Sequence, residues 1–297
     1  MLDRQKGADL FGSPTVWNHT VYIGISGQNG DPTLPLRGSV VAVNEGNGDK
    51  VWETFAVPPK FNGGAVWSTP SIDAATGHLF VGTGNAYSAP AASTTDAMLE
   101  LNARTGALLH SFQATSNDVF SSNNPVGVDF DFGASPNLIA AGSRKLVGEG
   151  QKSGTYWALD RSTLKPAWSQ TVGPGSAVGG IIGSTAYDGR RIYGPVTPAG
   201  EQWALSADGG VDWASADGGP LHFSPTSVAN GVVYTADDSG FLTLREASTG
   251  AILDKVPVGG MTYGGVAIAG EYVFVAVGTQ SSSGYVVAYR ADPPAAP

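Results

Sequence analysis

Two aspartates, Asp129 and Asp131, stand two positions apart in the segment Val-Asp-Phe-Asp-Phe. In an extended backbone the side chains alternate, so both carboxylates would lie on the same face. Paired carboxylates near a cation can serve acid–base chemistry. The alternative is a solvated strand edge, and the spacing alone leaves both interpretations open.

Three further side chains are suited to binding. Asn85 ends the stretch Gly-Thr-Gly-Asn, and its neutral amide oxygen suits a hard cation such as Ca²⁺, although capping a tight turn is a very common role for asparagine. The indole of Trp67 offers a broad surface for stacking, or for packing between sheets. Lys152, in Gly-Gln-Lys-Ser-Gly, carries a positive charge that is either fixed at a site or solvated on a hairpin.

Other catalytic arrangements are missing from the sequence. It has no nucleophile elbow with a histidine partner, and no Gly-x-Gly-x-x-Gly between a strand and a helix. The absence of cysteine excludes disulfides, thiolate metal sites and the attachment motif of a c-type haem. The four histidines lack metal-ligand spacing, and we expect them at the surface or in packing positions: His19, His78, His110 and His222.

A recurring hairpin shows which elements must position these side chains. An apolar strand leads to Asp/Asn/Glu-x-x-Thr/Asn-Gly, and an apolar residue or Trp follows four positions later. The turns recur about every 40 to 60 residues, and the shorter spacing is typical of one four-stranded propeller blade. The copies are VVAVNEGNGDKVW (Val40–Trp52), MLELNARTGALLH (Met98–His110), YWALDRSTLKPAW (Tyr156–Trp168), QWALSADGGVDW (Gln202–Trp213) and LTLREASTGAILD (Leu242–Asp254).

The residue types of this repeat predict its geometry. An Asx-type residue starts each tight turn, and a glycine accepts the positive φ that follows; Leu164 takes this place in the third copy. We expect the tryptophans of the fourth position to pack between blades: Trp52, Trp168 and Trp213. A strand–turn–strand element precedes each hairpin, as in Gly12–Ser26, Ser68–Gly84 and Ser224–Asp238.

The pattern predicts an all-β fold, a single β-propeller domain of four-stranded antiparallel blades over residues 1–297. About five full blades and most of a sixth are visible. Because the chain opens almost directly on the first strand pair, we expect one or two N-terminal blades to be missing from a ring of seven or eight. A smaller closed ring of six blades is the alternative.

Composition agrees with this fold and excludes some functions. The 297 residues include 42 glycines, and only 14% are charged against about 25% in a typical soluble domain. The net charge of −9 argues against a nucleic-acid partner. The sequence contains no run of 18 apolar residues, so it predicts no membrane-spanning helix. The first residues also lack the apolar stretch of a signal peptide.

Three stretches, in this order, resemble the pyrroloquinoline quinone (PQQ) dehydrogenases, most closely the polyvinyl-alcohol type. The first is similar to the segment that places a tryptophan under the quinone, the second to the loop with the catalytic aspartate, and the third to a strand with a conserved cation. The resemblance covers about residues 12 to 290. The stretches are GGAVWSTPSIDAATGHLFVGTGN (Gly63–Asn85), TSNDVFSSNNPVGVDFDF (Thr115–Phe132) and GQKSGTYWALDR (Gly150–Arg161).

This resemblance implies a quinoprotein that oxidises polyvinyl alcohol or a secondary alcohol with PQQ and Ca²⁺, by base-assisted hydride transfer to the quinone. It implies that Asp129 is the base, with Asp131 as second choice, and also a metal ligand. Lys152 would contact the quinone oxygens and assist catalysis, Trp67 would form the floor under the quinone, and Asn85 would bind both metal and cofactor.

The sequence also departs from the family. An acidic Ca²⁺ ligand is expected near Gln28, which would take its place as a metal ligand, and Asp31 could substitute only if the loop folds back. Electrons would leave to a separate acceptor such as a cytochrome c, and relatives imply a periplasmic or extracellular location. Two alternatives remain: a propeller without cofactor that serves as a protein-binding scaffold, and an enzyme fragment that cannot bind the cofactor.

Overall fold

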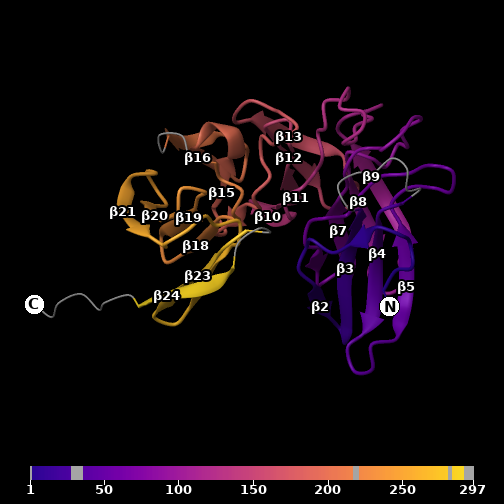
Figure 1. Cartoon of the computed structure of the whole chain (residues 1–297), viewed down its shortest axis with the longest axis horizontal. Helices are drawn as coiled ribbons and strands as arrows, with labels where there is room; N and C mark the ends of the chain where they lie inside the picture. Colours follow the sequence, from indigo (N-terminus) through magenta and orange to yellow (C-terminus); the bar gives the residue numbers. More distant parts are fainter. Residues whose placement is uncertain (1, 28–35, 217–220, 280–282, 291–297) are drawn as a thin grey trace, which may run out of the picture.

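The computed structural model describes residues 2–27, 36–216, 221–279 and 283–290. These residues form six antiparallel sheets and one short 3-10 helix, η2 (Thr197–Ala199), in agreement with the predicted all-β fold. They include no long apolar helix of the kind that crosses a bilayer. Figure 1 shows the sheets following one another along the chain, from the indigo first sheet to the gold last one.

Each sheet is built from consecutive strands, paired in chain order. The first sheet contains β1 (Ala8–Asp9), β2 (Thr15–Trp17), β3 (Thr20–Gly27), β4 (Ser39–Asn44) and β5 (Lys50–Phe55). The second contains β6 (Ser71–Asp73), β7 (His78–Gly82), β8 (Ala97–Asn102) and β9 (Leu108–Gln113). The third contains β10 (Asn137–Ala141), β11 (Arg144–Gly150), β12 (Thr155–Asp160) and β13 (Pro166–Thr171).

The second half of the chain repeats this plan. The fourth sheet contains β14 (Ala186–Tyr187), β15 (Arg191–Val196), β16 (Glu201–Ser206) and β17 (Val211–Ala216). The fifth contains β18 (Ser227–Ala229), β19 (Val232–Ala236), β20 (Phe241–Glu246) and β21 (Ile252–Pro257). The sixth has three strands, β22 (Val266–Ala269), β23 (Tyr272–Val277) and β24 (Tyr285–Arg290), the incomplete blade that the repeat predicted.

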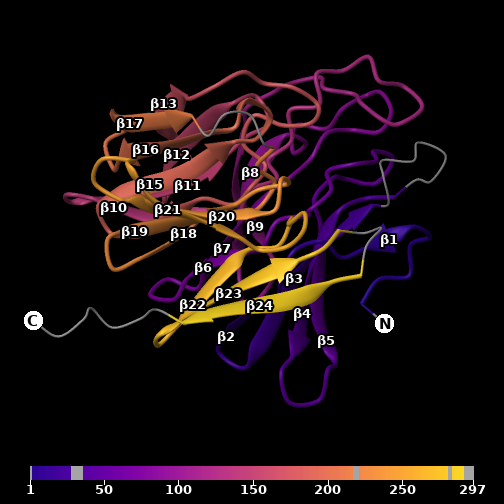
Figure 2. The ribbon, with the colours of Figure 1, turned by 60° about the vertical axis from the view of Figure 1, so that its left-hand side comes forward.

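The first strands of neighbouring sheets contact one another in sequence, from β2 through β6, β10, β14 and β18 to β22. Figure 2 shows the gold strands β22–β24 from a second direction. Five apolar clusters lie between neighbouring sheets: Val40 of β4 packs with Leu79 of β7 and Leu99 of β8, for example. Packing between successive blades is the arrangement of a propeller, which confirms the predicted architecture.

The hairpin turns have the predicted geometry. In the first, Asn44 Oδ1 accepts the backbone N–H of Gly46, at 2.9 Å, and Gly48 has φ +75°. Each hairpin also has a register shift between its last two strands, such as that between Ala42 and Val43. The other turn residues also have positive φ: Gly106 (+73°), Leu164 (+50°), Gly209 (+93°) and Gly250 (+74°).

The predicted packing of tryptophan between blades is confirmed at three interfaces. Each indole lies on the turn glycine of the next sheet, so closely that a Cβ there would come within 2.6–2.7 Å of the ring. Each indole Nε1 also donates to a backbone carbonyl of the next sheet. The pairs are Trp52 to Ala103 (3.0 Å), Trp168 to Ala207 (3.1 Å) and Trp213 to Ala247 (2.9 Å).

The second sheet departs from this pattern. His110 stands where three of the other four hairpins carry tryptophan and the fifth carries Asp254, and the corresponding turn of the third sheet has Leu164 in place of glycine. His110 Nδ1 lies 2.7 Å from Glu100 Oε2, and His78 Nδ1 contacts the other oxygen of Glu100. Glu100 is fully buried, so the two half-exposed imidazoles satisfy both oxygens of a carboxylate that water cannot reach.

Candidate active site

A pocket of about 300 Å³ opens among the first three sheets. In an antiparallel blade, the end of the second strand and the segment before the first strand lie at the same edge. The ends of β3, β7 and β11 therefore meet the segments that lead into β2, β6 and β10. The pocket is lined by Phe11, Ser26, Gly27, Ala65, Trp67, Asn85, Tyr87, Phe120, Ser121, Ser122, Asp129, Asp131 and Lys152.

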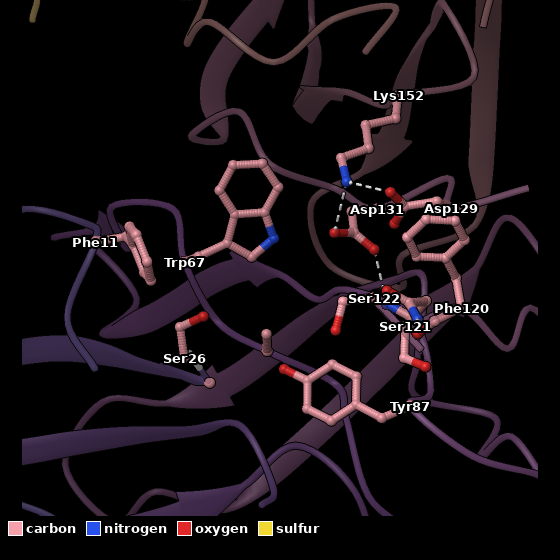
Figure 3. Close-up of a pocket in the computed structure, with 13 residues that line it drawn as sticks. Phe11, Ser26, Trp67, Tyr87, Phe120, Ser121, Ser122, Asp129, Asp131 and Lys152 are labelled. Atoms are coloured by element: carbon pink, nitrogen blue, oxygen red, sulfur yellow. Dashed lines mark hydrogen bonds and ion pairs between the residues drawn. The ribbon is translucent and has the colours of Figure 1, made fainter. Parts of the chain in front are cut away.

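Trp67, Asn85, Asp129 and Lys152, the four described side chains among the predicted site residues, lie together in this pocket (Figure 3). They come from segments far apart in the sequence, and the order of the blades brings them to one place. Gln28 lies outside the described residues, as does Asp31.

Lys152 lies between the two aspartates. Its Nζ donates to Asp129 Oδ2 at 2.9 Å and to Asp131 Oδ2 at 3.1 Å, and all three residues are less than 10% exposed. The same ammonium lies 5.5 Å from the centroid of the Trp67 ring, within range of a cation–π contact. A fixed positive charge thus connects the aromatic side of the pocket with its acidic side (Figure 3).

The two aspartates differ in their partners. Asp131 Oδ1 accepts the backbone N–H of Asn85 at 2.8 Å, so both oxygens of Asp131 have partners. Asp129 Oδ1 has no hydrogen-bond partner among the described residues, and Asp129 lines the pocket. Asp129 is therefore the carboxylate of the pair that can accept a proton from a ligand.

Burial and the neighbouring Asp131 carboxylate raise the pKa of Asp129 to about 6, while Lys152 opposes the shift. Burial on its own would lower the pKa of Lys152, but the Asp131 and Asp129 carboxylates outweigh it and raise that pKa. Near neutral pH the pair therefore consists of an ammonium and an ionised Asp129 that can still take up a proton.

The backbone at the aspartates differs from the extended segment that their spacing suggested. Residues 128–133 form a loop, and Asp129 has φ +58°, a left-handed conformation that aspartate tolerates better than most residues. Asp118 Oδ2 accepts the N–H of Phe130 at 2.9 Å, and Asp131 O accepts the N–H of Lys152 at 2.9 Å. These contacts, rather than the alternation of a strand, direct both carboxylates toward Lys152.

Asn85 is held with its amide oxygen free. Its Nδ2 donates to Ala86 O at 2.7 Å and to Phe120 O at 2.6 Å, which uses both amide hydrogens and fixes the orientation of the group. Oδ1 has no partner within the described residues. A fixed, unpartnered amide oxygen beside carboxylates is a donor set that suits a hard cation.

Several residues in or behind the pocket had no signal in the sequence. Tyr87 is 5% exposed, follows Asn85 by two positions, and burial followed by the charges of Asp131 and Asp129 raises its pKa. Asp96 is fully buried behind the site, and neither of its oxygens has a partner among the described residues. Burial, with Asp131 as the next cause, raises the pKa of Asp96 to about 10, so it is neutral at pH 7.

The chain is similar to known proteins in sequence. A PQQ-type family profile described as "Outer membrane protein assembly factor BamB" matches residues 36–216 and, in a second match, residues 121–292. The chain is 28% identical to a polyvinylalcohol dehydrogenase of Sphingopyxis sp. (strain 113P3), over 87% of this chain and 48% of that protein. It is 30% identical to a polyvinylalcohol dehydrogenase of Pseudomonas sp., over 65% of this chain and 35% of that protein.

The chain thus spans about half the length of the first of these relatives and about a third of the second. A similar fold occurs in the crystal structure of a quinohemoprotein alcohol dehydrogenase from Comamonas testosteroni. The TM-score is 0.76 at 19% identity, over 92% of this chain and 57% of that chain. At this identity the likeness concerns the fold, and it agrees with the propeller described above.

Proposed function

The chain belongs to the PQQ-repeat family described as outer membrane protein assembly factor BamB, and from this premise we propose that it is an alcohol oxidoreductase that uses PQQ and Ca²⁺. The observation that carries the proposal is the gathering of Trp67, Asn85, Asp129 and Lys152 in one pocket. The names of the two polyvinylalcohol dehydrogenases support secondary or polymeric alcohols as the substrate class.

PQQ, when bound, supplies a two-electron acceptor for the hydrogen on the alcohol carbon. Asp129 Oδ1 accepts the proton of the alcohol hydroxyl. Its raised pKa of about 6 lies near neutral pH, where a base is both ionised and able to hold the proton. Asp131 positions Asn85 and Lys152 instead, because both of its oxygens already accept hydrogen bonds.

Lys152 and Trp67 would bind the cofactor. The ammonium of Lys152 lies between the indole and the carboxylates, where it can donate to oxygens of the quinone and stabilise negative charge that develops on them. The indole of Trp67 supplies a flat apolar surface for stacking. The second and third sheets hold both side chains in place, so binding of the cofactor costs little side-chain conformational entropy.

The donor atoms fit a hard cation. Asn85 Oδ1 would hold Ca²⁺, which would polarise the acceptor, and by resemblance Asp129 would contribute through the carboxylate oxygen that does not take the proton. By resemblance, Gln28 would contribute a third oxygen. Because an amide there carries no negative charge, we expect weaker Ca²⁺ binding than in a site with an additional carboxylate.

The electrons would pass to a separate acceptor, such as a cytochrome c, because this cysteine-free chain cannot attach a c-type haem. Relatives favour a periplasmic or extracellular location for such chemistry.

A protein-binding scaffold without cofactor is the second candidate. It is favoured by the description of the family as an assembly factor. It is also favoured by the small number of charged donors, since the described residues contain no group of three or more His, Cys, Asp or Glu side chains arranged to hold a metal. The two candidates differ in whether the pocket binds PQQ.

Titration of the protein with PQQ in the presence of Ca²⁺ tests the proposal. We expect quenching of tryptophan fluorescence and dye-linked oxidation of a secondary alcohol. Since the chain has seven tryptophans, Trp67→Phe is the matched variant and should remove most of the quenching. Quenching without turnover would show that the pocket binds PQQ without oxidising the alcohol, which would refute the oxidoreductase activity. An unchanged signal with PQQ well above micromolar concentration would refute the quinoprotein proposal.

A further inference from the structure

Phe11 lines the pocket from the first sheet, and no family motif pointed to it. Its side chain lies on the same side of the pocket as Trp67 and across from Phe120 (Figure 3). Phe11 is 48% exposed. A ring that lines a pocket and keeps half of its surface exposed has apolar area available to a ligand.

The segment that carries Phe11 is anchored at its beginning. The side-chain amide of Gln5 pairs with the backbone of Arg37 in both directions. Arg37 N donates to Gln5 Oε1 at 3.0 Å, and Gln5 Nε2 donates to Arg37 O at 2.9 Å. Asp3 Oδ1 accepts the backbone N–H of Gln5 at 2.7 Å. Residues 3–5 are thereby fixed to the first sheet.

The segment is also held on both sides of Phe11. Strand β1 pairs with the end of β3, and its residue Asp9 lies opposite Ser26, which itself lines the pocket. Directly after Phe11, a Cβ on Gly12 would come within 2.5 Å of Ser68 O, so this position requires the close approach that glycine allows. Ser13 N then donates to Thr69 Oγ1 at 3.0 Å.

The repeat relates Phe11 to Trp67. Phe11 precedes Gly-Ser-Pro and Trp67 precedes Ser-Thr-Pro, so both residues stand three positions before the proline that leads into the first strand of a sheet. The third sheet has Gly133 at this position, before Ala-Ser-Pro, and the indole of Trp67 lies against it. Two consecutive blades therefore present an aromatic ring to the same pocket from equivalent positions.

We propose that Phe11 is a specificity-determining residue that contacts the hydrocarbon part of the alcohol beside the reacting carbon. Trp67 lies within reach of Lys152, whereas Phe11 lies on the side of Ser26, away from Lys152 and the two aspartates (Figure 3). An apolar surface apart from the charged groups suits the non-reacting chain of the substrate. This inference rests on the proposed alcohol oxidation for its substrate class.

The test compares Phe11→Ala with Leu10→Ala. Leu10 is a matched control, because it is 46% exposed and lines a separate hollow with Leu2 and Ala8. With PQQ and Ca²⁺ present, kcat/KM is measured for 2-octanol and 2-propanol. We expect Phe11→Ala to lower the ratio of kcat/KM for 2-octanol to kcat/KM for 2-propanol about tenfold. The effect should arise mainly through KM for 2-octanol, because its longer chain loses the apolar contact with the ring. Leu10→Ala should leave the ratio unchanged.

A second measurement does not depend on turnover. Binding of 2-octanol to the protein is followed by saturation-transfer NMR, and PQQ affinity by fluorescence. The inference would be overturned if Phe11→Ala kept the wild-type ratio of kcat/KM for the two alcohols. It would also be overturned if the variant lost PQQ affinity and not selectivity for 2-octanol. A wild-type protein that oxidises no alcohol but binds 2-octanol through Phe11 would overturn the proposed function alone. Absence of both binding and oxidation would overturn both.

Discussion

The indole ring of Trp67 lies directly against the backbone of Gly133. A Cβ built on residue 133 would come within 2.0 Å of the ring atom Cη2. Trp67 leads into the second sheet and Gly133 into the third, so this contact crosses the blade interface beside which the two aspartates and Lys152 lie. The aromatic side of the pocket therefore depends on the absence of a side chain at one position of the neighbouring blade.

Gly133→Ala should displace the indole of Trp67. The methyl group cannot be accommodated at 2.0 Å from a rigid ring, so the ring or the backbone must move, at a cost of roughly 1–3 kcal/mol in the free energy of unfolding. We expect PQQ affinity to fall at least tenfold, measured by fluorescence quenching. Gly46→Ala is the control, since the nearest neighbour of a Cβ there is the Asn44 side chain, at 3.4 Å. Equal PQQ affinity in wild type and Gly133→Ala would show that Trp67 does not contact the cofactor.

The rate should depend on the ionisation of Asp129. Its pKa is raised to about 6, so the fraction of the base in its active, ionised form increases as pH rises through 6. We expect kcat/KM to rise about tenfold per pH unit below 6 and to become constant above it. Asp129→Asn should reduce turnover by two orders of magnitude or more, with PQQ binding nearly intact. Turnover that survives this substitution would place the base elsewhere.

The sequence predicted the fold because the information is local. A glycine four positions after an Asx residue specifies a turn with positive φ, as at Gly48, and a tryptophan four positions later specifies the contact with the next blade, as at Trp52. The exchange of Trp for His110 was visible in the sequence. Its pairing with Glu100 was not, because that depends on the register of β8 and β9, in which these two residues lie opposite each other.

The pocket was predictable only in part. Alignment to a family pattern located Trp67 and Lys152, and the order of the blades brought them together. Phe11 and Tyr87 lie on loops, where no periodicity indicates the direction of a side chain. The loop geometry at Asp129 could not be predicted either, because neither composition nor residue spacing indicates a left-handed φ at a single aspartate.

Asp96 should make the stability of the protein depend on pH. Its folded pKa of about 10 exceeds the ordinary aspartate pKa of 3.8, which applies in the unfolded chain. Its contribution to stability is therefore present below pH 4 and is lost progressively as pH rises toward 10. Asp96→Asn cannot titrate, and asparagine tolerates the φ of +50° at this position. In urea unfolding, we expect the free energy of unfolding of Asp96→Asn, relative to that of the wild type, to increase by about 1 kcal/mol per pH unit between pH 5 and 8.

The control for this experiment is Asp254→Asn, which makes the same change on the exposed side of β21 and should alter stability little at either pH. If the difference between Asp96→Asn and wild type were constant from pH 5 to 8, the Asp96 carboxyl would be ionised in the folded protein. A cation or bound water beside it would then have to supply its missing partner.

The contact between tryptophan and turn glycine can be separated from backbone strain by two substitutions. Gly209 has φ +93° and lies on Trp168, whereas Gly189 has φ +91° and nothing within 4 Å of its Cβ position. Alanine should cost about 1 kcal/mol at Gly189 through strain alone. At Gly209 we expect a further 1–3 kcal/mol, because the methyl would lie 2.7 Å from the indole. Similar urea midpoints for the two variants would show that the contact contributes little to joining the blades.

Lys152→Met should shift the pH dependence of the reaction. Without the ammonium, the Asp129 and Asp131 carboxylates face each other in a buried site with no adjacent cation among the described residues. The pKa of Asp129, already raised to about 6 by burial and by Asp131, must rise further. We therefore expect the midpoint of the kcat/KM profile to move upward by at least one pH unit. Lys152→Arg keeps the charge and should leave the midpoint within a few tenths of a unit, even if altered geometry lowers kcat. A lysine that only stabilised the loop would reduce the yield of folded protein in the Met variant while its midpoint stayed near 6.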